Sequence, residues 1–132
     1  DQVVLNVYEL ALACSEASAS NALGSAVAQG DNDAQATRFT PSCAGMGRDH
    51  VVLWTAPQPG TFRFDTQGSA LDTVLAIYDA DCLEELACND DGGSGFSSTL
   101  DRTMQQGDQI AIVIGGFRGR NGQWQLNINV RP

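Results

Sequence analysis

Acidic and amide side chains gather in a glycine-rich stretch of the sequence, where their oxygen atoms could bind a cation. Asn89, Asp90 and Asp91 are followed by two glycines, and Asp72 opens a neighbouring predicted strand. Calcium takes roughly six to eight oxygen ligands, and Asp and Asn beside flexible glycine supply them. These four residues are therefore a candidate calcium site. The alternative is that they cap turns through local hydrogen bonds, as Asp and Asn commonly do.

A second acidic cluster offers the same kind of ligand. Asp31 and Asp33 lie in one predicted loop, and Asp49 lies at the start of a predicted strand. We rank this cluster below the first as a candidate cation site.

The segment of residues 115–122, GGFRGRNG, concentrates the cations of an otherwise acidic chain. It places Phe117, Arg118 and Arg120 among four glycines. An aromatic ring and two guanidinium groups could stack on a sugar or bind a carboxylate, so these three residues are candidate ligand-binding residues. The alternative is a hairpin tip, in which the phenylalanine folds back onto the protein and the arginines offset the negative net charge.

No arrangement of residues predicts catalysis. The single histidine, His50, lies beside Asp49 at the entrance to a predicted strand, a place typical of a strand-end side chain. The carboxylates of Glu84 and Glu85 are adjacent, and adjacent side chains on an extended backbone point to opposite faces. Glycosidase chemistry needs two carboxyls that face each other across a cleft. We therefore expect a protein that is not an enzyme.

Length and charge exclude several classes of function. A chain of 132 residues is long enough for one domain with a core. Sixteen acidic residues against seven arginines and no lysine give a net charge of -9, which argues against binding to nucleic acid or to anionic membranes. No apolar run reaches the roughly 20 residues that a membrane-spanning helix needs. The chain begins at Asp1, which fits a removed leader or a chosen boundary.

Four cysteines without a C-x-x-C pair indicate disulfides rather than a zinc site. Four cysteines allow three pairings. The short separation favours a bond between Cys82 and Cys88, which leaves Cys14 to pair with Cys43. Disulfides form in oxidising compartments, so the sequence predicts a secreted, extracellular protein.

Apolar and polar residues alternate between short runs of Gly, Asn, Asp and Ser, a pattern typical of an all-β protein. In the last predicted strand, Trp124, Leu126, Ile128 and Val130 share one face, which we expect to be core. Trp54 is expected in the core as well. The predicted strands are His50–Ala56, Thr61–Thr66, Thr73–Tyr78, Gln109–Ile114 and Gln123–Val130.

Two segments near the N-terminus are open to more than one interpretation. Residues 23–27 could form an edge strand or belong to a helix over residues 16–28; Gly24 within the run favours the strand. Residues 1–13 contain an alternating strand set apart by an Ala- and Ser-rich stretch. Val3, Leu5 and Val7 of this strand could pair with the open sheet edge of another copy.

The order of motifs from Arg48 onward resembles the bacterial pre-peptidase C-terminal domain. These motifs are GRDHVVLWTAPQPGTFRFDT, LDTVLAIYDADC, ELACNDDGG, GDQIAIVIGGF and GQWQLNINV, within residues 41–130. The resemblance implies a jelly-roll-like antiparallel β-sandwich, related to the collagen-binding domains of secreted clostridial collagenases. It implies an accessory module without catalysis.

The chain departs from the family pattern in two places. Gly115 stands where family members commonly carry an Asp before the Gly-aromatic pair. The acidic linker that helps the collagenase relatives to bind calcium is missing, because residues 10–23 contain Glu16 as their only acidic residue. Calcium and collagen binding therefore do not follow from the resemblance.

Two functions agree with these observations. The first is a non-catalytic, secreted binding or adhesion module, with calcium as a candidate stabilising ion, that attaches to polysaccharide, an extracellular matrix protein or a cell surface. The second is a structural subunit that assembles with copies of itself into an extracellular fibre or surface layer through residues 1–13.

Overall fold

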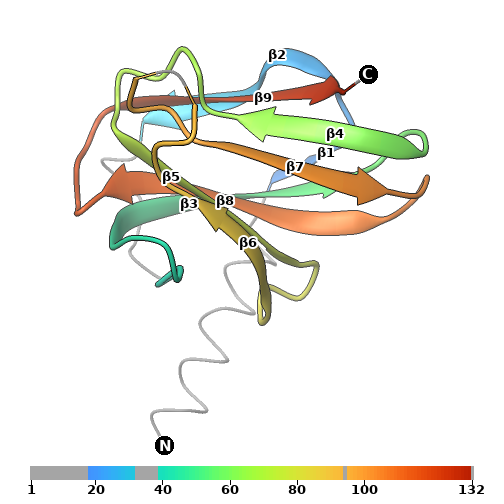
Figure 1. Cartoon of the computed structure of the whole chain (residues 1–132), viewed down its shortest axis with the longest axis horizontal. Coiled ribbons are helices and arrows are strands. Elements are labelled where there is room, and N and C mark those ends of the chain that lie inside the picture. Colours follow the sequence, from blue (N-terminus) through green and yellow to red (C-terminus); the bar gives the residue numbers. More distant parts are fainter. Residues whose placement is uncertain (1–17, 32–38, 94, 132) are drawn as a thin grey trace, which may run out of the picture.

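The chain folds into two β-sheets packed face to face (Figure 1). The computed structural model describes residues 18–31, 39–93 and 95–131. The five-stranded sheet has the order β1-β3-β8-β5-β6, and the four-stranded sheet has the order β2-β9-β4-β7. The predicted all-β sandwich is confirmed. The strands are β1 (Ser18–Ser20), β2 (Gly24–Asp31), β3 (Met46–Thr55), β4 (Gly60–Asp65), β5 (Thr73–Asp79), β6 (Glu85–Asn89), β7 (Thr99–Met104), β8 (Gln109–Phe117) and β9 (Gln123–Val130).

The five predicted strands are present as β3, β4, β5, β8 and β9, with ends shifted by up to four residues. The segment that could be a strand or a helix is β2, an edge strand of the four-stranded sheet. The described pairs of neighbouring strands are antiparallel except that of β1 with β3, which is parallel. Among the described residues, no helix is long and apolar enough to cross a membrane.

Several predictions fall on residues that lie outside the described ranges. These are the strand within residues 1–13, with its self-assembly residues Val3, Leu5 and Val7, and the residues Cys14 and Asp33.

The main core lies between the two sheets. Trp54 is fully buried at its centre, and its ring meets those of Phe62 and Phe64 edge-on, with centroids 5.0 and 5.4 Å away. Trp124 is also buried, so both tryptophans occupy the core as predicted. The prediction for Val130 is wrong: its side chain is 43% exposed. The paired part of β2 ends opposite Ile128, so β9 has no neighbour on that side at Val130.

A second apolar cluster covers the outer face of the five-stranded sheet. It contains every second side chain of β3, β5 and β8, because these side chains point away from the main core. Its buried members are Phe39, Val51, Val74, Ala76, Tyr78, Cys82, Ala111 and Val113. Strands buried on both faces carry continuous apolar runs, which explains why TVLAIY in β5 and IAIVI in β8 do not alternate.

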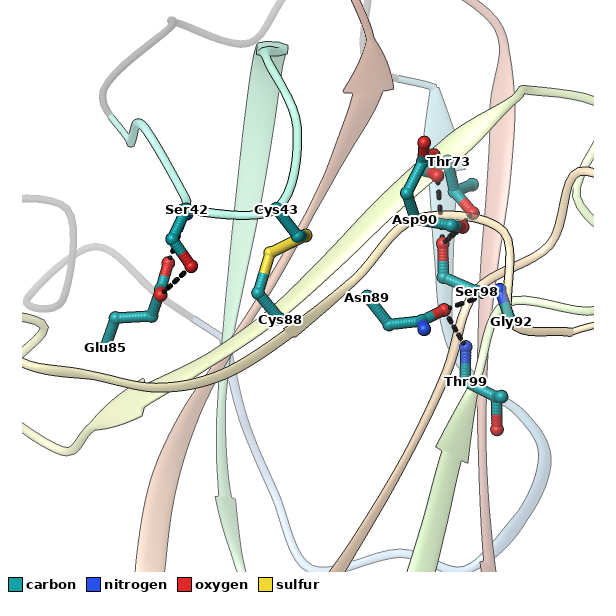
Figure 2. Close-up of a disulfide and its surroundings, with 10 residues drawn as sticks. All are labelled: Ser42, Cys43, Thr73, Glu85, Cys88, Asn89, Asp90, Gly92, Ser98 and Thr99. Atoms are coloured by element: carbon teal, nitrogen blue, oxygen red, sulfur yellow. Dashed lines mark hydrogen bonds between the residues drawn. A yellow bond between two sulfur atoms is a disulfide. The ribbon is translucent and has the colours of Figure 1, made fainter.

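The outer cluster is closed by residues 39–45, which we call the cover segment. The ring of Phe39 packs 4.9 Å from that of Tyr78, and its main-chain N–H donates to Asp49 Oδ2 at 2.9 Å. The N–H and hydroxyl of Ser42 donate to the two carboxylate oxygens of Glu85 at 2.7 and 2.5 Å. The cover segment is therefore attached to β6 as well as to the sheet face (Figure 2).

A disulfide completes this attachment, and it corrects the predicted pairing. Cys43 of the cover segment is bonded to Cys88 of β6, with their Cα atoms 5.8 Å apart. Cys82 is disulfide-bonded too. The predicted bonds Cys82–Cys88 and Cys14–Cys43 are therefore wrong. Cys82 lies in the turn that follows β5, whereas Cys88 is paired with Ala76, three residues before the end of that strand. Three residues of extended strand span about 10 Å, which exceeds the roughly 7 Å between Cα atoms that a disulfide bridges.

The Cys43–Cys88 bond closes a loop with a sequence separation of 45. On the chain-entropy model, a loop of this length restricts the unfolded chain enough to stabilise the fold by about 4 kcal/mol. The bond thus links two segments of the fold that lie far apart in the sequence, where the prediction expected a short loop within one hairpin.

Peptide mapping tests this pairing. Trypsin together with a Glu-specific protease separates Cys82 from Cys88, because Glu84 and Glu85 lie between them. Under non-reducing conditions we expect the peptide of residues 39–48 to be linked to that of residues 86–102, and reduction to release both. A peptide of residues 86–102 linked instead to one that carries Cys82 would contradict the structure.

Candidate functional site

Three buried hydroxyl side chains form the base of the candidate site. Thr66 follows β4, Thr73 opens β5 and Ser98 precedes β7, and all three are fully buried. Thr66 Oγ1 lies 2.6 Å from Thr73 Oγ1, which lies 3.0 Å from Ser98 Oγ. The N–H of Ser98 donates to Thr66 Oγ1 at 2.8 Å. This hydroxyl network joins strands of both sheets at one end of the sandwich.

The loop after β6 is fixed by hydrogen bonds to this network and to Asn89. The hydroxyl of Ser98 hydrogen-bonds the main-chain oxygen of Asp90 (Figure 2). Asn89 Oδ1 accepts from the N–H groups of Gly92 and Thr99 at 2.9 and 3.0 Å. A Cβ at Gly92 would lie 2.5 Å from Asn89 Nδ2, so a larger residue there would displace the amide that holds the loop. The oxygen of Asn89 is thus engaged in capping the loop, as the alternative interpretation expects.

The structure brings together the other three predicted ligands, Asp72, Asp90 and Asp91, which we call the acidic trio. One carboxylate oxygen of each lies within 4.8 Å of the others. The cause is the antiparallel pairing of β5 with β6, because Asp72 precedes one strand and Asp90 follows the other at the same end of the sheet. Among the described residues, this is the only such group of three acidic, histidine or cysteine side chains.

The acidic trio has unsatisfied acceptors. Oδ1 of Asp72 and Oδ1 of Asp90 are buried, and neither accepts a hydrogen bond. Burial raises the pKa of the Asp72 carboxyl above its usual value of 3.8, and the charge of Asp91 raises it further. Burial likewise raises the pKa of Asp90, followed by the charges of Asp91 and Asp72. The three carboxylates repel one another when ionised, and bringing them together at neutral pH costs stability.

One arginine offsets part of this repulsion. Arg120 Nε lies 4.0 Å from Asp72 Oδ2, and its side chain is 65% exposed. It lowers the pKa of Asp72, but by less than burial and Asp91 raise it. An exposed pair at this distance contributes little. The trio is therefore suited to a hard cation, which needs several oxygen ligands and supplies compensating charge.

The three predicted ligand-binding residues at the end of β8 and in the loop after it have different neighbours. Phe117 is half-buried and packs against the outer cluster, and the guanidinium of Arg118 stacks over its ring at 5.1 Å. Arg120 instead faces Asp72. The backbone folds tightly here, because a Cβ at Gly116 would lie 1.8 Å from the main-chain oxygen of Arg120.

The second-ranked acidic cluster has two members among the described residues, Asp31 and Asp49, and its third, Asp33, lies outside them. Asp31 is exposed at the end of β2, in the four-stranded sheet. Asp49 lies in the other sheet, is fully buried, and accepts the N–H of Phe39. The carboxylate of Asp49 therefore serves to hold the cover segment.

Sequence reasoning missed a pocket beside the acidic trio. It has a volume of about 410 Å³ and is lined by Ala70, Leu71, Asp72, Phe96, Arg120 and Asn121. We call it the Phe96 pocket. The signal that could have found it is the isolated aromatic residue in the loop GGSGFSS, because a phenylalanine between glycine and serine has no alternating strand pattern to bury it.

The comparisons with known proteins concern the fold. The sequence matches no protein-family model and no curated protein. The structure is similar to the crystal structure of the pre-peptidase C-terminal domain of collagenase from Bacillus anthracis. The two share 10% sequence identity with a TM-score of 0.54, over 86% of this chain and 95% of that chain. This likeness confirms the predicted resemblance at the level of the fold.

The raised pKa values predict how stability without metal depends on pH. The folded-state pKa of Asp90 lies above 3.8, so its protonated form is favoured by folding. This contribution is fully present below pH 3.8 and is lost as the pH rises through the folded-state pKa. An asparagine side chain is neutral at every pH, so the Asp90→Asn variant keeps this contribution to stability across the whole range. In EDTA, we expect Asp90→Asn to match the wild type in Tm near pH 3.5 and to exceed it increasingly towards pH 7.

The matched control is Asp81→Asn, which removes one exposed acidic charge in the turn between β5 and β6. It corrects for the general relief of a net charge of -9. If Tm rises equally with pH, relative to the wild type, in Asp81→Asn and in Asp90→Asn, repulsion within the acidic trio does not cause the effect.

Proposed function

We propose that this chain is a non-catalytic, secreted binding module, stabilised by calcium, that attaches to polysaccharide, to an extracellular matrix protein or to a cell surface. The fold likeness to an accessory domain of a collagenase supports the binding role. The Cys43–Cys88 disulfide supports an oxidising, extracellular location.

The observation that carries the calcium part is the geometry of the acidic trio. Three carboxylates converge, and two buried oxygens among them accept no hydrogen bond. Buried acceptors without partners are costly in folded proteins. A calcium ion at Asp72, Asp90 and Asp91 would supply the missing partner and cancel the mutual repulsion. The carbonyl and water ligands that complete its coordination would come from the loop after β6 and from solvent.

The described side chains with catalytic potential have structural roles. His50 is half-buried in β3, and its ring lies 4.8 Å from that of Trp124. Both Cys82 and Cys88 are disulfide-bonded. These arrangements support a binding role rather than catalysis.

Calcium should raise the thermal stability of the full chain. At a hundredfold excess over its Kd, a ligand stabilises a fold by about 2.7 kcal/mol, which corresponds to a rise in Tm of roughly 10 °C for a chain of this size. We expect this rise for the wild type between EDTA and excess calcium. Asp72→Asn should lose most of it and Asp81→Asn should keep it. Equal Tm values for the wild type in both buffers would contradict the calcium site.

Sedimentation with insoluble polymers tests the binding role. The full chain in calcium is mixed with cellulose, chitin, xylan, peptidoglycan and fibrillar collagen, and the protein left in the supernatant is measured. We expect at least one polymer to deplete the chain more than an unrelated acidic protein of similar size. If all five leave both proteins equally in solution, the proposed binding role is wrong.

A further inference from the structure

The Phe96 pocket combines four kinds of chemical group around one opening. It offers the aromatic ring of Phe96, the carboxylate of Asp72, the guanidinium of Arg120 and the amide of Asn121. Its volume of about 410 Å³ lies in the range of roughly 300–1,000 Å³ typical of small-molecule sites. The pocket therefore has the size and the mixture of apolar and polar groups of a ligand site.

The ring of Phe96 is exposed although its backbone is fixed. The side chain is 69% exposed, the largest exposure among the described large apolar residues. Its carbonyl accepts the N–H of Thr73 at 3.3 Å, and the N–H of Gly93 donates to the neighbouring Ser97 carbonyl at 3.1 Å. Thr73 belongs to the buried hydroxyl network. An aromatic ring presented on a fixed backbone gives contact area at a low cost in conformational entropy.

The charges in the pocket select the class of ligand. With calcium bound to the acidic trio, a cationic ligand would meet that ion and the guanidinium of Arg120, which lies 4.0 Å from Asp72. An anionic ligand would approach a chain of net charge -9. A neutral ligand avoids both penalties. The amide of Asn121 both donates and accepts, a carboxylate accepts and a guanidinium donates, so hydroxyl groups would satisfy all three.

We infer that the Phe96 pocket binds one neutral sugar unit of a polysaccharide. The C–H face of a pyranose ring stacks on Phe96, and its hydroxyls bond to Asp72, Asn121 and Arg120. This inference rests on the proposed function, since it names the ligand class and the contact surface of that binding module. Of the three residues predicted from the sequence to bind a ligand, Arg120 alone lines the pocket.

An NMR titration of the full isotope-labelled chain tests the inference. The probes are soluble cello-, xylo-, manno- and chito-oligosaccharides. With at least one of them we expect shifts concentrated on the amides of Phe96, Asn121 and their neighbours. Phe96→Ala should weaken that binding by about tenfold, as removal of a central aromatic contact does. The matched control is Leu83→Ala, which removes an apolar side chain that is 49% exposed in another loop and should leave the affinity unchanged.

Each other outcome overturns the inference. If none of the four probes shifts the pocket amides, the pocket does not bind neutral sugars. The pocket assignment is also wrong if Phe96→Ala and Asn121→Ala bind the oligosaccharide with the affinity of the wild type. Their unfolding curves must match that of the wild type for this comparison. Shifts at these amides with a lysine-rich peptide, and with none of the sugars, would assign the pocket to a protein partner.

The polymer sedimentation experiment keeps the two proposals apart. A chain that sediments with collagen but leaves its pocket unshifted by sugars retains the proposed function and loses the pocket assignment. A chain that sediments with no polymer loses the proposed function, whatever the pocket amides show.

Discussion

Three buried hydroxyl groups hold the end of this sandwich that carries the candidate site. Thr66, Thr73 and Ser98 come from strand ends of both sheets and are excluded from solvent, so each must find its hydrogen-bond partner inside the protein. They find it in one another and in the main chain of the adjoining loops. Ser98 also bonds the main-chain oxygen of Asp90, and the main-chain N–H of Thr73 donates to the carbonyl of Phe96. The same three residues therefore fix the backbone beside a carboxylate and an aromatic ring.

The sequence predicts the strands that carry long apolar or alternating patterns, and it misses those that do not. Strand β9 alternates strictly and is found with its observed ends, whereas β6 is five residues long and half-buried throughout. Residue Asn127 lies on the polar face of β9 but is buried. Its amide accepts from Ala26 at the bulge of β2 and donates to Asp65. A bulge depends on pairing between distant segments, so alternation along one strand cannot reveal this role.

The candidate site is predictable to the extent that its residues adjoin strand ends. Asp90 and Asp91 stand out because glycines follow them, and Asp72 because it opens a strand; the pairing of β5 with β6 then brings them together. The role of Asn89 differs, because its nearest donors are main-chain groups of its own loop. The Cys43–Cys88 bond lies beyond such reasoning, since it depends on how a loop crosses the outer face of a sheet.

That crossing makes the closure of an apolar sheet face depend on the redox state of two thiols. The cover segment is attached to the edge strand β6 by one covalent bond and by the hydrogen bonds of Ser42, and beneath it lies an apolar sheet face. In a reducing compartment the covalent bond is absent, and hydrogen bonds and apolar contacts alone hold the segment. The same sequence is therefore closed more firmly under oxidising conditions than under reducing ones.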